Sequence, residues 1–201
     1  MARMLWNELM ALVAGILGCL PGRSGRLLRR LYYRPQFAAC GRTLSIGEHG
    51  EIACPTSIRL GDRIYIDRGI VLRACEGGSI AIGDDFGANG NVRIIADCGG
   101  RIEIGSKVII GPNTVIRASD HAMDRTDIPI RDQGHTAGTV SIGDGVWIAA
   151  NVVVLRGARI GEHAVIGAGS VVTGEIPAYA VAAGVPARVI RQRQHAPAAP
   201  A

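Results

Sequence analysis

The sequence predicts an all-β protein, a parallel β-helix of hexapeptide repeats with a helical arm before it. Aliphatic or small residues recur at steps of six, as in Ile104, Ile110 and Ile116. Apolar-Gly-polar triplets mark each restart of that period, at 46–48, 60–62, 82–84, 104–106, 142–144 and 160–162. The 28 glycines and an aromatic share of 4% suit tight corners around a narrow core. A fixed six-residue period indicates a solenoid whose coils bury a core only by stacking.

Residues 1–42 are assigned to an N-terminal apolar and basic helical arm. They hold seven arginines and one acid, Glu8, for a charge of +6, whereas the remaining 15 basic and 16 acidic residues give −1. No charge lies between Leu9 and Gly22, a run shorter than the roughly 20 residues of a membrane span. Arginines mixed with leucines and tyrosines then follow up to Arg34. This pattern favours peripheral contact of residues 1–34 with an anionic membrane.

Two other interpretations of the arm stay open. The helix can pack on the coil and cap its apolar edge. A cleavable signal peptide fits less well, because Glu8 lies in the region that should be basic. Binding to nucleic acid is not favoured, since the basic stretch is rich in leucine and joins a nearly neutral body.

Residues 43–190 are assigned to the coil domain. Eighteen residues make one three-sided coil, and the triplets at 142 and 160 have that spacing. The spacing of 22 from 60 to 82 and from 82 to 104 places bulged corners at 76–79 and 98–101. The spacing of 38 from 104 to 142 predicts an inserted loop at about 118–139, the kind of segment that often carries function. Residues 191–201 are expected to form a flexible Pro/Ala tail.

The five cysteines, an odd number without a C-x-x-C pair, argue against a disulfide framework or a metal site. They favour a reducing compartment. Cys75 and Cys98 lie 23 residues apart and are expected to pack on neighbouring coils. We therefore expect a cytoplasmic protein, in contact with the inner face of the cytoplasmic membrane if the arm binds lipid.

Further motifs follow one another between about Ile82 and Arg191, a little over half of the chain. In order they are Phe86–Asn91, Asp97, His121–Asp124, Gly145–Ile148, Gly167–Thr173 and Ala183–Arg191. In this order, on this repeat, they resemble the hexapeptide-repeat O-acetyltransferases, in the branch of the galactoside, maltose and polysaccharide acetyltransferases. The resemblance implies a left-handed β-helix, a homotrimer and acetyl transfer from acetyl-CoA to a sugar hydroxyl, with no metal.

The resemblance also implies which residues act on the acceptor. A neutral hydroxyl is a poor nucleophile, and histidine can accept its proton near neutral pH. His121, at the start of the inserted loop, is the implied catalytic base, and His135 is a second candidate. Asn89 and Asp97 match acceptor-binding positions, where an amide and a carboxylate suit sugar hydroxyls. Their alternative roles are a corner residue for Asn89 and a turn for Asp97.

Six residues match the family's coenzyme-binding positions. Trp147 matches the thioester end, and three small residues match positions along the pantetheine arm. Two arginines match positions that meet the phosphates, a role that suits guanidinium groups, although a solvated tail is the alternative. These five residues are Ala150, Ala168, Thr173, Arg188 and Arg191.

The apolar and basic arm departs from the polar helical cap of the simple sugar acetyltransferases. It favours a lipid-linked or envelope polysaccharide as the acceptor. A free-sugar or serine O-acetyltransferase and a non-catalytic β-helix assembly module are the alternatives. A zinc-dependent carbonic anhydrase is rejected, because no closely spaced pair of histidine ligands is present. Ala122 follows His121 where proline is common in the family.

Overall fold

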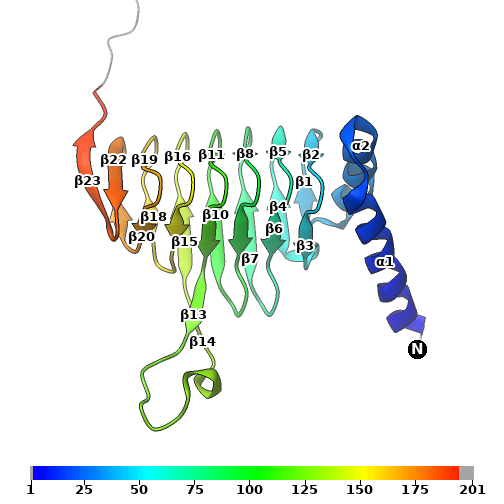
Figure 1. The fold of residues 1–201 in the computed structure, drawn as a ribbon, viewed down its shortest axis with the longest axis horizontal. Helices are drawn as coiled ribbons and strands as arrows, with labels where there is room; N and C mark the ends of the chain where they lie inside the picture. Colours follow the sequence, from blue (N-terminus) through cyan, green and yellow to red (C-terminus); the bar gives the residue numbers. More distant parts are fainter. Residues whose placement is uncertain (1, 195–201) are drawn as a thin grey trace, which may run out of the picture.

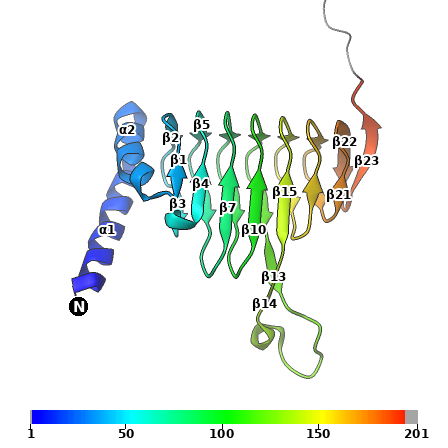
Figure 2. The same ribbon diagram turned by 180° about the vertical axis from the view of Figure 1, so that it is seen from behind.

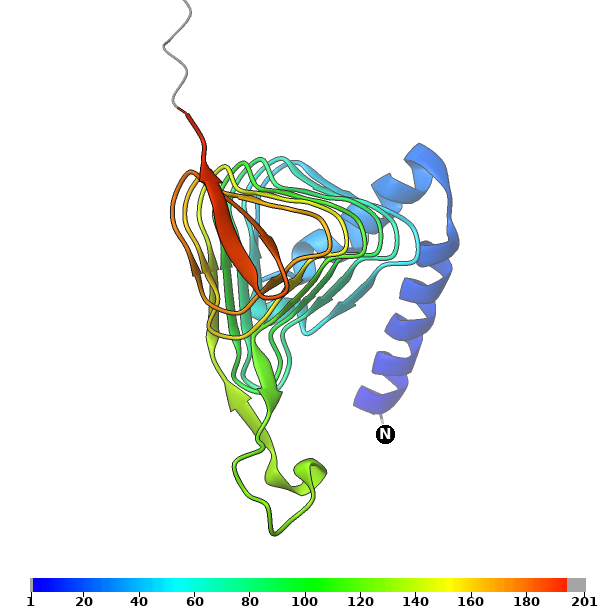
Figure 3. The same ribbon diagram turned by 60° about the vertical axis from the view of Figure 1, so that its left-hand side comes forward.

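The computed structural model describes residues 2–194 as a triangular solenoid with two helices at one end (Figure 1). Residues 195–201, most of the predicted tail, lie outside the described residues. Three sheets wrap around the solenoid, and each of the six complete coils contributes a parallel strand to every sheet. Viewed toward its C-terminal end, the solenoid has a rounded triangular outline (Figure 3). The predicted parallel β-helix is therefore confirmed.

The strands are short, as six-residue sides require. The first sheet contains β1 Ala39–Cys40, β4 Ile58–Leu60, β7 Ser79–Ile82, β10 Arg101–Ile104, β15 Thr139–Ile142, β18 Arg159–Ile160 and β21 Glu175–Ile176. The second contains β2 Leu44–Ile46, β5 Ile64–Ile66, β8 Gly87–Ala88, β11 Ile109–Ile110, β16 Trp147–Ile148, β19 Val165–Ile166, β22 Ala180–Gly184 and β23 Ala187–Gln192. The third contains β3 Glu51–Ala53, β6 Val71–Arg73, β9 Arg93–Ile95, β12 Val115–Arg117, β17 Val153–Val154 and β20 Val171–Val172.

The residues of the six-residue period point into the solenoid. Ile104, Ile110 and Ile116, one from each sheet, are between 0% and 4% exposed. Each pairs in register with its equivalent on the next coil, as Ile104 does with Ile142. This stacking builds one continuous core along the axis, because no single coil has an interior of its own.

Five of the six triplets, from 60–62 to 160–162, lie at the corner between the first and second sheets, whereas 46–48 lies at the next corner, after β2. At the corner between the first and second sheets the polar residue holds the preceding coil: Asp84 Oδ1 accepts the Asp62 N–H at 2.7 Å, and Asp144 Oδ1 accepts the Ser106 N–H at 2.7 Å. A Cβ atom on Gly61 would lie only 2.3 Å from Asp84 Oδ1. Glycine is required in the middle of the triplet because this carboxylate approaches the backbone so closely.

The corner between the second and third sheets carries a ladder of asparagines. Asn91, Asn113 and Asn151 have φ values of 61°, 59° and 57°, a left-handed conformation that asparagine tolerates. The Asn91 side-chain amide donates to Asn113 at 3.2 Å, and Asn113 donates to Asn151 at 3.2 Å. The ladder ties three successive coils together on the outside of the core.

The extra residues leave the solenoid at the corner between the third and first sheets. The longest excursion is a hairpin of β13 (Ser119–His121) and β14 (His135–Ala137), with a 3₁₀ helix η3 (Ile130–Gln133) between them. Figures 1 and 3 show this hairpin standing out from the coils. The segment expected to be inserted at about 118–139 thus forms an antiparallel hairpin.

The cysteines differ from the expectation. Cys54 and Cys75 form a disulfide between neighbouring coils, next to a 3₁₀ helix η2 (Pro55–Ser57). Cys75 does not stack on Cys98: its backbone N–H bonds Asp97, while Cys98 is level with Glu76. The prediction was wrong because equivalent positions on these coils are 22 residues apart, whereas the two cysteines are 23 apart and therefore lie one position out of line.

The arm consists of α1 (Ala2–Cys19), α2 (Gly22–Tyr33) and the 3₁₀ helix η1 (Arg34–Gln36). Figures 1 and 2 show both helices at the N-terminal end of the solenoid. Strand β1 already pairs with β4, so the first coil begins at Ala39. No helix in residues 2–194 is long and apolar enough to cross a bilayer.

Arg29 of α2 anchors the arm to the first coil. Its side chain is 1% exposed and donates to the carbonyl oxygens of Leu17, Leu20 and Ile46 at 2.7–2.9 Å. Ile46 lies on β2, the edge strand of the second sheet, so this guanidinium satisfies an edge carbonyl that has no preceding coil. The packing interpretation of the arm therefore holds for the inner face of α2.

We expect Arg29→Leu to loosen the arm, because the substitution removes a hydrogen-bond donor from each of three carbonyl groups. The loss should be about 3 kcal/mol of local stability, or roughly 100-fold faster amide hydrogen exchange in α1 and α2. Arg23→Leu, on the exposed side of α2, is the matched control and should change exchange little. Equal exchange rates in the two variants would contradict the anchoring role.

Candidate active site

The projecting hairpin places two histidines opposite each other. His121 of β13 and His135 of β14 are register partners, and their ring centroids lie 4.3 Å apart with an interplanar angle of 33°. Both side chains are exposed. Sequence spacing alone did not pair them, because fourteen residues separate them and the antiparallel register was not predicted. Two exposed imidazoles on this hairpin can exchange protons with a bound ligand.

An ion pair fixes the base of the hairpin. Asp120 Oδ2 lies 3.0 Å from Arg156 Nε, which comes from the corner between β17 and β18. The Gly138 N–H also donates to the Ala118 carbonyl oxygen at 2.9 Å. Because Asp120 directly precedes His121, these contacts orient the strand that carries the histidine.

A polar pocket of about 290 Å³ lies beside the hairpin at the same corner. His135 contributes one wall, and side chains of three coils form the rest. The pocket brings Asp97 and His135 together, as the sequence did not predict. It also contains two arginines that the sequence analysis missed; the full lining is Arg73, Glu76, Ile95, Asp97, Cys98, Arg117 and His135.

Asp97 contacts both the backbone and a side chain at this pocket. It is 9% exposed, and its Oδ1 accepts the Cys75 N–H at 2.9 Å while Oδ2 lies 2.7 Å from Arg73 Nε. The carboxylate thus holds the corner backbone and orients Arg73 at the pocket. Next to it, the Cys98 thiol donates to Glu76 at 2.9 Å, and this hydrogen bond raises the pKa of the thiol.

Asn89 does not join this group. It is exposed and follows β8 at the corner between the second and third sheets, where its N–H bonds the Ile110 carbonyl. Strand β9 separates it from Asp97. Within one chain the two predicted acceptor-binding residues therefore lie at different corners.

The predicted coenzyme residues gather mainly around the second sheet. Trp147, 51% exposed, pairs with Val165, which pairs with Val181, which pairs with Arg191. Three strand spacings of about 4.8 Å make this row about 14 Å long. Arg188 lies on the same strand β23 as Arg191.

Two of the three small residues flank that row. Ala150 and Ala168 lie at successive levels of the corner beside it, where the Gly169 N–H bonds the Ala150 carbonyl at 3.0 Å. Thr173 lies instead at the hairpin corner, after β20. Among residues 2–194, no three His, Cys, Asp or Glu side chains are grouped to hold a metal ion. Apart from Thr173, the predicted coenzyme residues thus lie on the second sheet and the corner beside it, whereas both histidines lie at the corner between the third and first sheets.

Known proteins share this repeat. The family profile described as "Bacterial transferase hexapeptide (six repeats)" matches residues 139–174. The galactoside O-acetyltransferase of Escherichia coli is 42% identical over 117 residues, which cover 58% of this chain and 55% of that protein. The putative lipopolysaccharide biosynthesis O-acetyl transferase WbbJ of E. coli is 34% identical over 146 residues, 69% of this chain and 74% of that protein. The chain spans 55–59% of the length of the first three curated relatives that it matches.

A solved structure extends the likeness over nearly the whole chain. It is a hexapeptide-repeat acetyltransferase of Vibrio cholerae in complex with acetyl coenzyme A, with a TM-score of 0.64 and 26% sequence identity. The superposition covers 94% of this chain and 89% of that one. Because so little of the chain lies outside the superposition, most of the helical arm is included in it.

Asp97→Ala should destabilise the fold as well as the pocket, because the Cys75 N–H and the Arg73 guanidinium both lose their acceptor. We expect a loss of about 2 kcal/mol in the free energy of unfolding, measured with urea. Asp97→Asn keeps an oxygen for the Cys75 N–H and should cost less than half as much. If the alanine variant is as stable as the parent, the carboxylate has no structural role.

Proposed function

The chain belongs to the hexapeptide-repeat acetyltransferase family, and we propose that it transfers an acetyl group from acetyl-CoA to a hydroxyl of a sugar. The observation that carries this proposal is the placement of His121. It stands on an ordered hairpin, pinned at its base through Asp120, beside a polar pocket. The galactoside O-acetyltransferase relative and the acetyl coenzyme A complex of the similar structure support the reaction class.

In this proposal His121 is the general base. Its imidazole removes the proton of the sugar hydroxyl while the oxygen attacks the thioester carbonyl carbon. The tetrahedral intermediate then collapses, the carbon–sulfur bond breaks, and the proton passes to the departing thiolate. Coenzyme A and the acetyl ester are the products. His135, in ring contact with His121, orients the imidazole and forms a wall of the pocket.

The row from Trp147 to Arg191 is the proposed coenzyme site. The exposed indole covers the thioester end, and Val165 and Val181 offer an apolar track for the pantetheine arm. Arg188 and Arg191 at the other end suit the phosphates, because guanidinium groups bind phosphate oxygens through paired hydrogen bonds. The small side chains of Ala150 and Ala168 leave room for the pantetheine arm at the flanking corner. Thr173 supplies a hydroxyl at the next corner.

The acceptor is proposed to be a saccharide of a surface polysaccharide or its lipid-linked precursor. The relative WbbJ, of which this chain covers 74%, carries a lipopolysaccharide biosynthesis name. The pocket suits sugar hydroxyls, because it offers carboxylates and guanidinium groups within about 290 Å³. Asn89 serves as the acceptor-binding amide contributed from the other corner.

We propose further that the active unit is a homotrimer with each site shared between two chains. The two histidines lie at the corner between the third and first sheets, and the coenzyme row lies along the second sheet, so one chain does not assemble the reacting atoms. A cyclic arrangement of three prisms brings the hairpin corner of one chain to the second sheet of its neighbour.

His121→Ala should reduce kcat by roughly 10²–10⁴, the usual contribution of a positioned general base. Its affinity for acetyl-CoA should stay nearly unchanged, because the coenzyme row lies elsewhere. Arg188→Ala is the reciprocal variant, with weaker coenzyme binding and chemistry mostly retained at saturation. Steady-state kinetics and calorimetric titration separate the two patterns. Near-normal turnover in folded His121→Ala protein would contradict the role of His121 and favour the alternative of a non-catalytic assembly module.

Mixed trimers test the shared site. A 1:1 mixture of His121→Ala chains with Arg188→Ala/Arg191→Ala chains should recover roughly a quarter of the parent activity after co-refolding, because each half of a site is intact in half of the chains. The assay uses acetyl-CoA well below saturation, where the arginine variant is inactive. A monomeric mass by light scattering, or no recovery in the mixture, would contradict the proposal.

A further inference from the structure

The outer side of the helical arm carries large apolar side chains that no described residue covers. On α1, Leu9, Leu12 and Ile16 are 50%, 61% and 57% exposed, and their spacing places them on one stripe. On α2, Leu27 and Leu31 are 53% and 63% exposed, one turn apart. The buried residues of α2 are on the other side, where Arg29 holds the coil. The leucines of α2 therefore lie on its outer side, and α1, which is apolar throughout from Leu9 to Cys19, also exposes large apolar side chains.

Arginines without acidic partners surround these leucines. Arg23, Leu27, Leu31 and Arg34 follow at steps of four, four and three, which makes one stripe along α2. The salt bridges of the arm use Arg26, with Asp67, and Arg29, with Glu48. Within residues 2–194, none is found for four others, Arg23, Arg30, Arg34 and Arg42. The apolar stripe thus lies among uncompensated positive charges.

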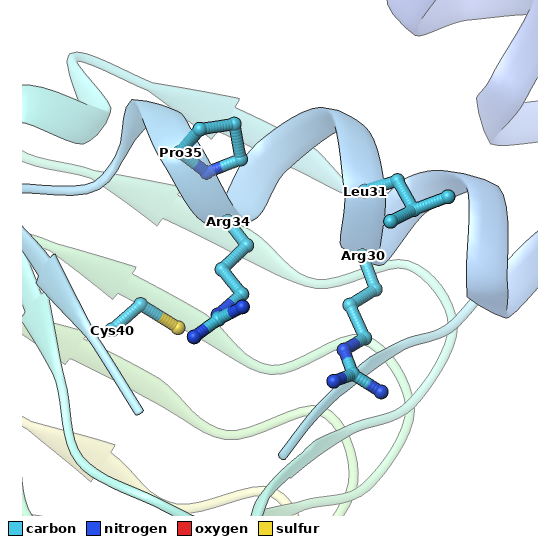
Figure 4. A pocket seen from close by; sticks show the side chains of 5 residues that line it. All are labelled: Arg30, Leu31, Arg34, Pro35 and Cys40. Carbon is cyan, nitrogen blue, oxygen red and sulfur yellow. The ribbon is translucent and has the colours of Figure 1, made fainter. Parts of the chain in front are cut away.

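Two of these arginines line a pocket of about 320 Å³ between α2 and the first strand. Figure 4 shows Arg30 and Arg34 reaching from the same side of the helix, with Cys40 beside Arg34 and Leu31 directed away from them. Arg30 Nη2 donates to the Arg42 carbonyl at 2.7 Å, and Arg34 Nε donates to the Gly41 carbonyl at 3.0 Å. Each guanidinium carries five N–H donors, so most remain for the oxygens of an anion.

We propose that the outer face of α1 and α2 docks on the surface of an anionic lipid bilayer. The exposed leucines and Ile16 enter the boundary of the acyl chains, and Arg30 and Arg34 bind lipid phosphates. Charge complementarity favours this occupant. A second copy docking through the same face would bring two arms of charge +6 together, while the rest of the chain, at −1, offers little attraction.

This docking surface goes beyond the proposed catalytic function and does not depend on it. No helix of the described residues spans a bilayer, so the contact is peripheral. Its effect would be to hold the N-terminal end of the solenoid at the lipid surface, with the coils and the hairpin outside the lipid. A membrane-bound acceptor would then reach the site by diffusion in two dimensions.

Sedimentation of the full-length protein with vesicles tests the proposal. The probes are vesicles of phosphatidylcholine alone and of equal parts phosphatidylcholine and phosphatidylglycerol, at low salt. Binding should require phosphatidylglycerol. Arg30→Gln/Arg34→Gln should weaken it by about 25-fold, because each arginine near an anionic surface contributes about a fivefold gain. Lys107→Gln/Arg159→Gln removes the same charge from the exposed coil surface and should bind like the parent.

Further variants separate the contributions of charge and apolar contact. Arg30→Lys/Arg34→Lys keeps the charge and should retain most of the binding, which also controls for folding of the glutamine pair. Leu27→Gln/Leu31→Gln keeps every charge and should weaken binding roughly tenfold or more, through lost apolar burial. Affinity for acetyl-CoA should be the same in all of them, so a failure here is distinct from a failure of the catalytic proposal.

Three results would overturn the proposal. The first is equal binding to both kinds of vesicle, because charge would then play no part. The second is the same loss of binding in the coil control as in the arm variant. The third is a change of oligomeric mass on Leu27→Gln/Leu31→Gln by light scattering, because the face would then be an interface between chains.

Discussion

Everything in this structure depends on the stacking of one coil on the next in exact register at the core positions. Ile104 lies over Ile142, Ile110 over Ile148 and Ile116 over Val154, and none of these side chains has an interior without its neighbours. A single methylene too many at such a position would be felt by two coils, because the space is already filled. The period of six is the trace that this constraint leaves in the sequence.

The same constraint decides where function can be added. A strand cannot accept extra residues without losing its register, whereas a corner can open outward. All of the long excursions lie at the corner between the third and first sheets, which carries the disulfide, the polar pocket and the hairpin with both histidines. The second sheet keeps regular strands, and its straight outer row from Trp147 to Arg191 offers a track parallel to the axis. The corner between the third and first sheets is thus irregular and carries the reactive side chains, whereas the second sheet presents a regular, straight surface.

The sequence was sufficient for whatever the period controls. It predicted the inward residues, the bulged corners and the extent of the insertion, because each follows from counting in sixes. It did not predict that His135 faces His121, since that pairing depends on the antiparallel register of a hairpin outside the period. Nor did it predict the burial of Arg29, because the arm was interpreted from charge and hydropathy, which do not tell an anchoring arginine from an exposed one. The 22-residue spacing places Asp97 level with Cys75, but the contact of its carboxylate with Arg73 depends on side-chain orientations that the spacing does not fix.

The sequence of the arm allows either packing on the coil or contact with a membrane. The two faces of the arm differ in their surroundings. The inner face packs through Arg29, Tyr33 and Gly25, all buried. The outer face keeps its leucines exposed, so an amphipathic helix can satisfy both interpretations at once. Composition alone could not separate them, because the arginines that serve the two faces follow one another within a single turn.

The two ends of the solenoid are also unlike each other. At the start, Arg29 and the Gly18 carbonyl take up the free groups of the first coil at Ile46 and His49. At the finish, β23 turns back antiparallel to β22 and presents Arg188 and Arg191 at the last edge of the second sheet. A stack of identical coils could otherwise continue from molecule to molecule as a fibre, since each end offers the surface that the other end fits. With one end closed by a helix and the other by a charged, reversed strand, the repeat stops at a fixed length.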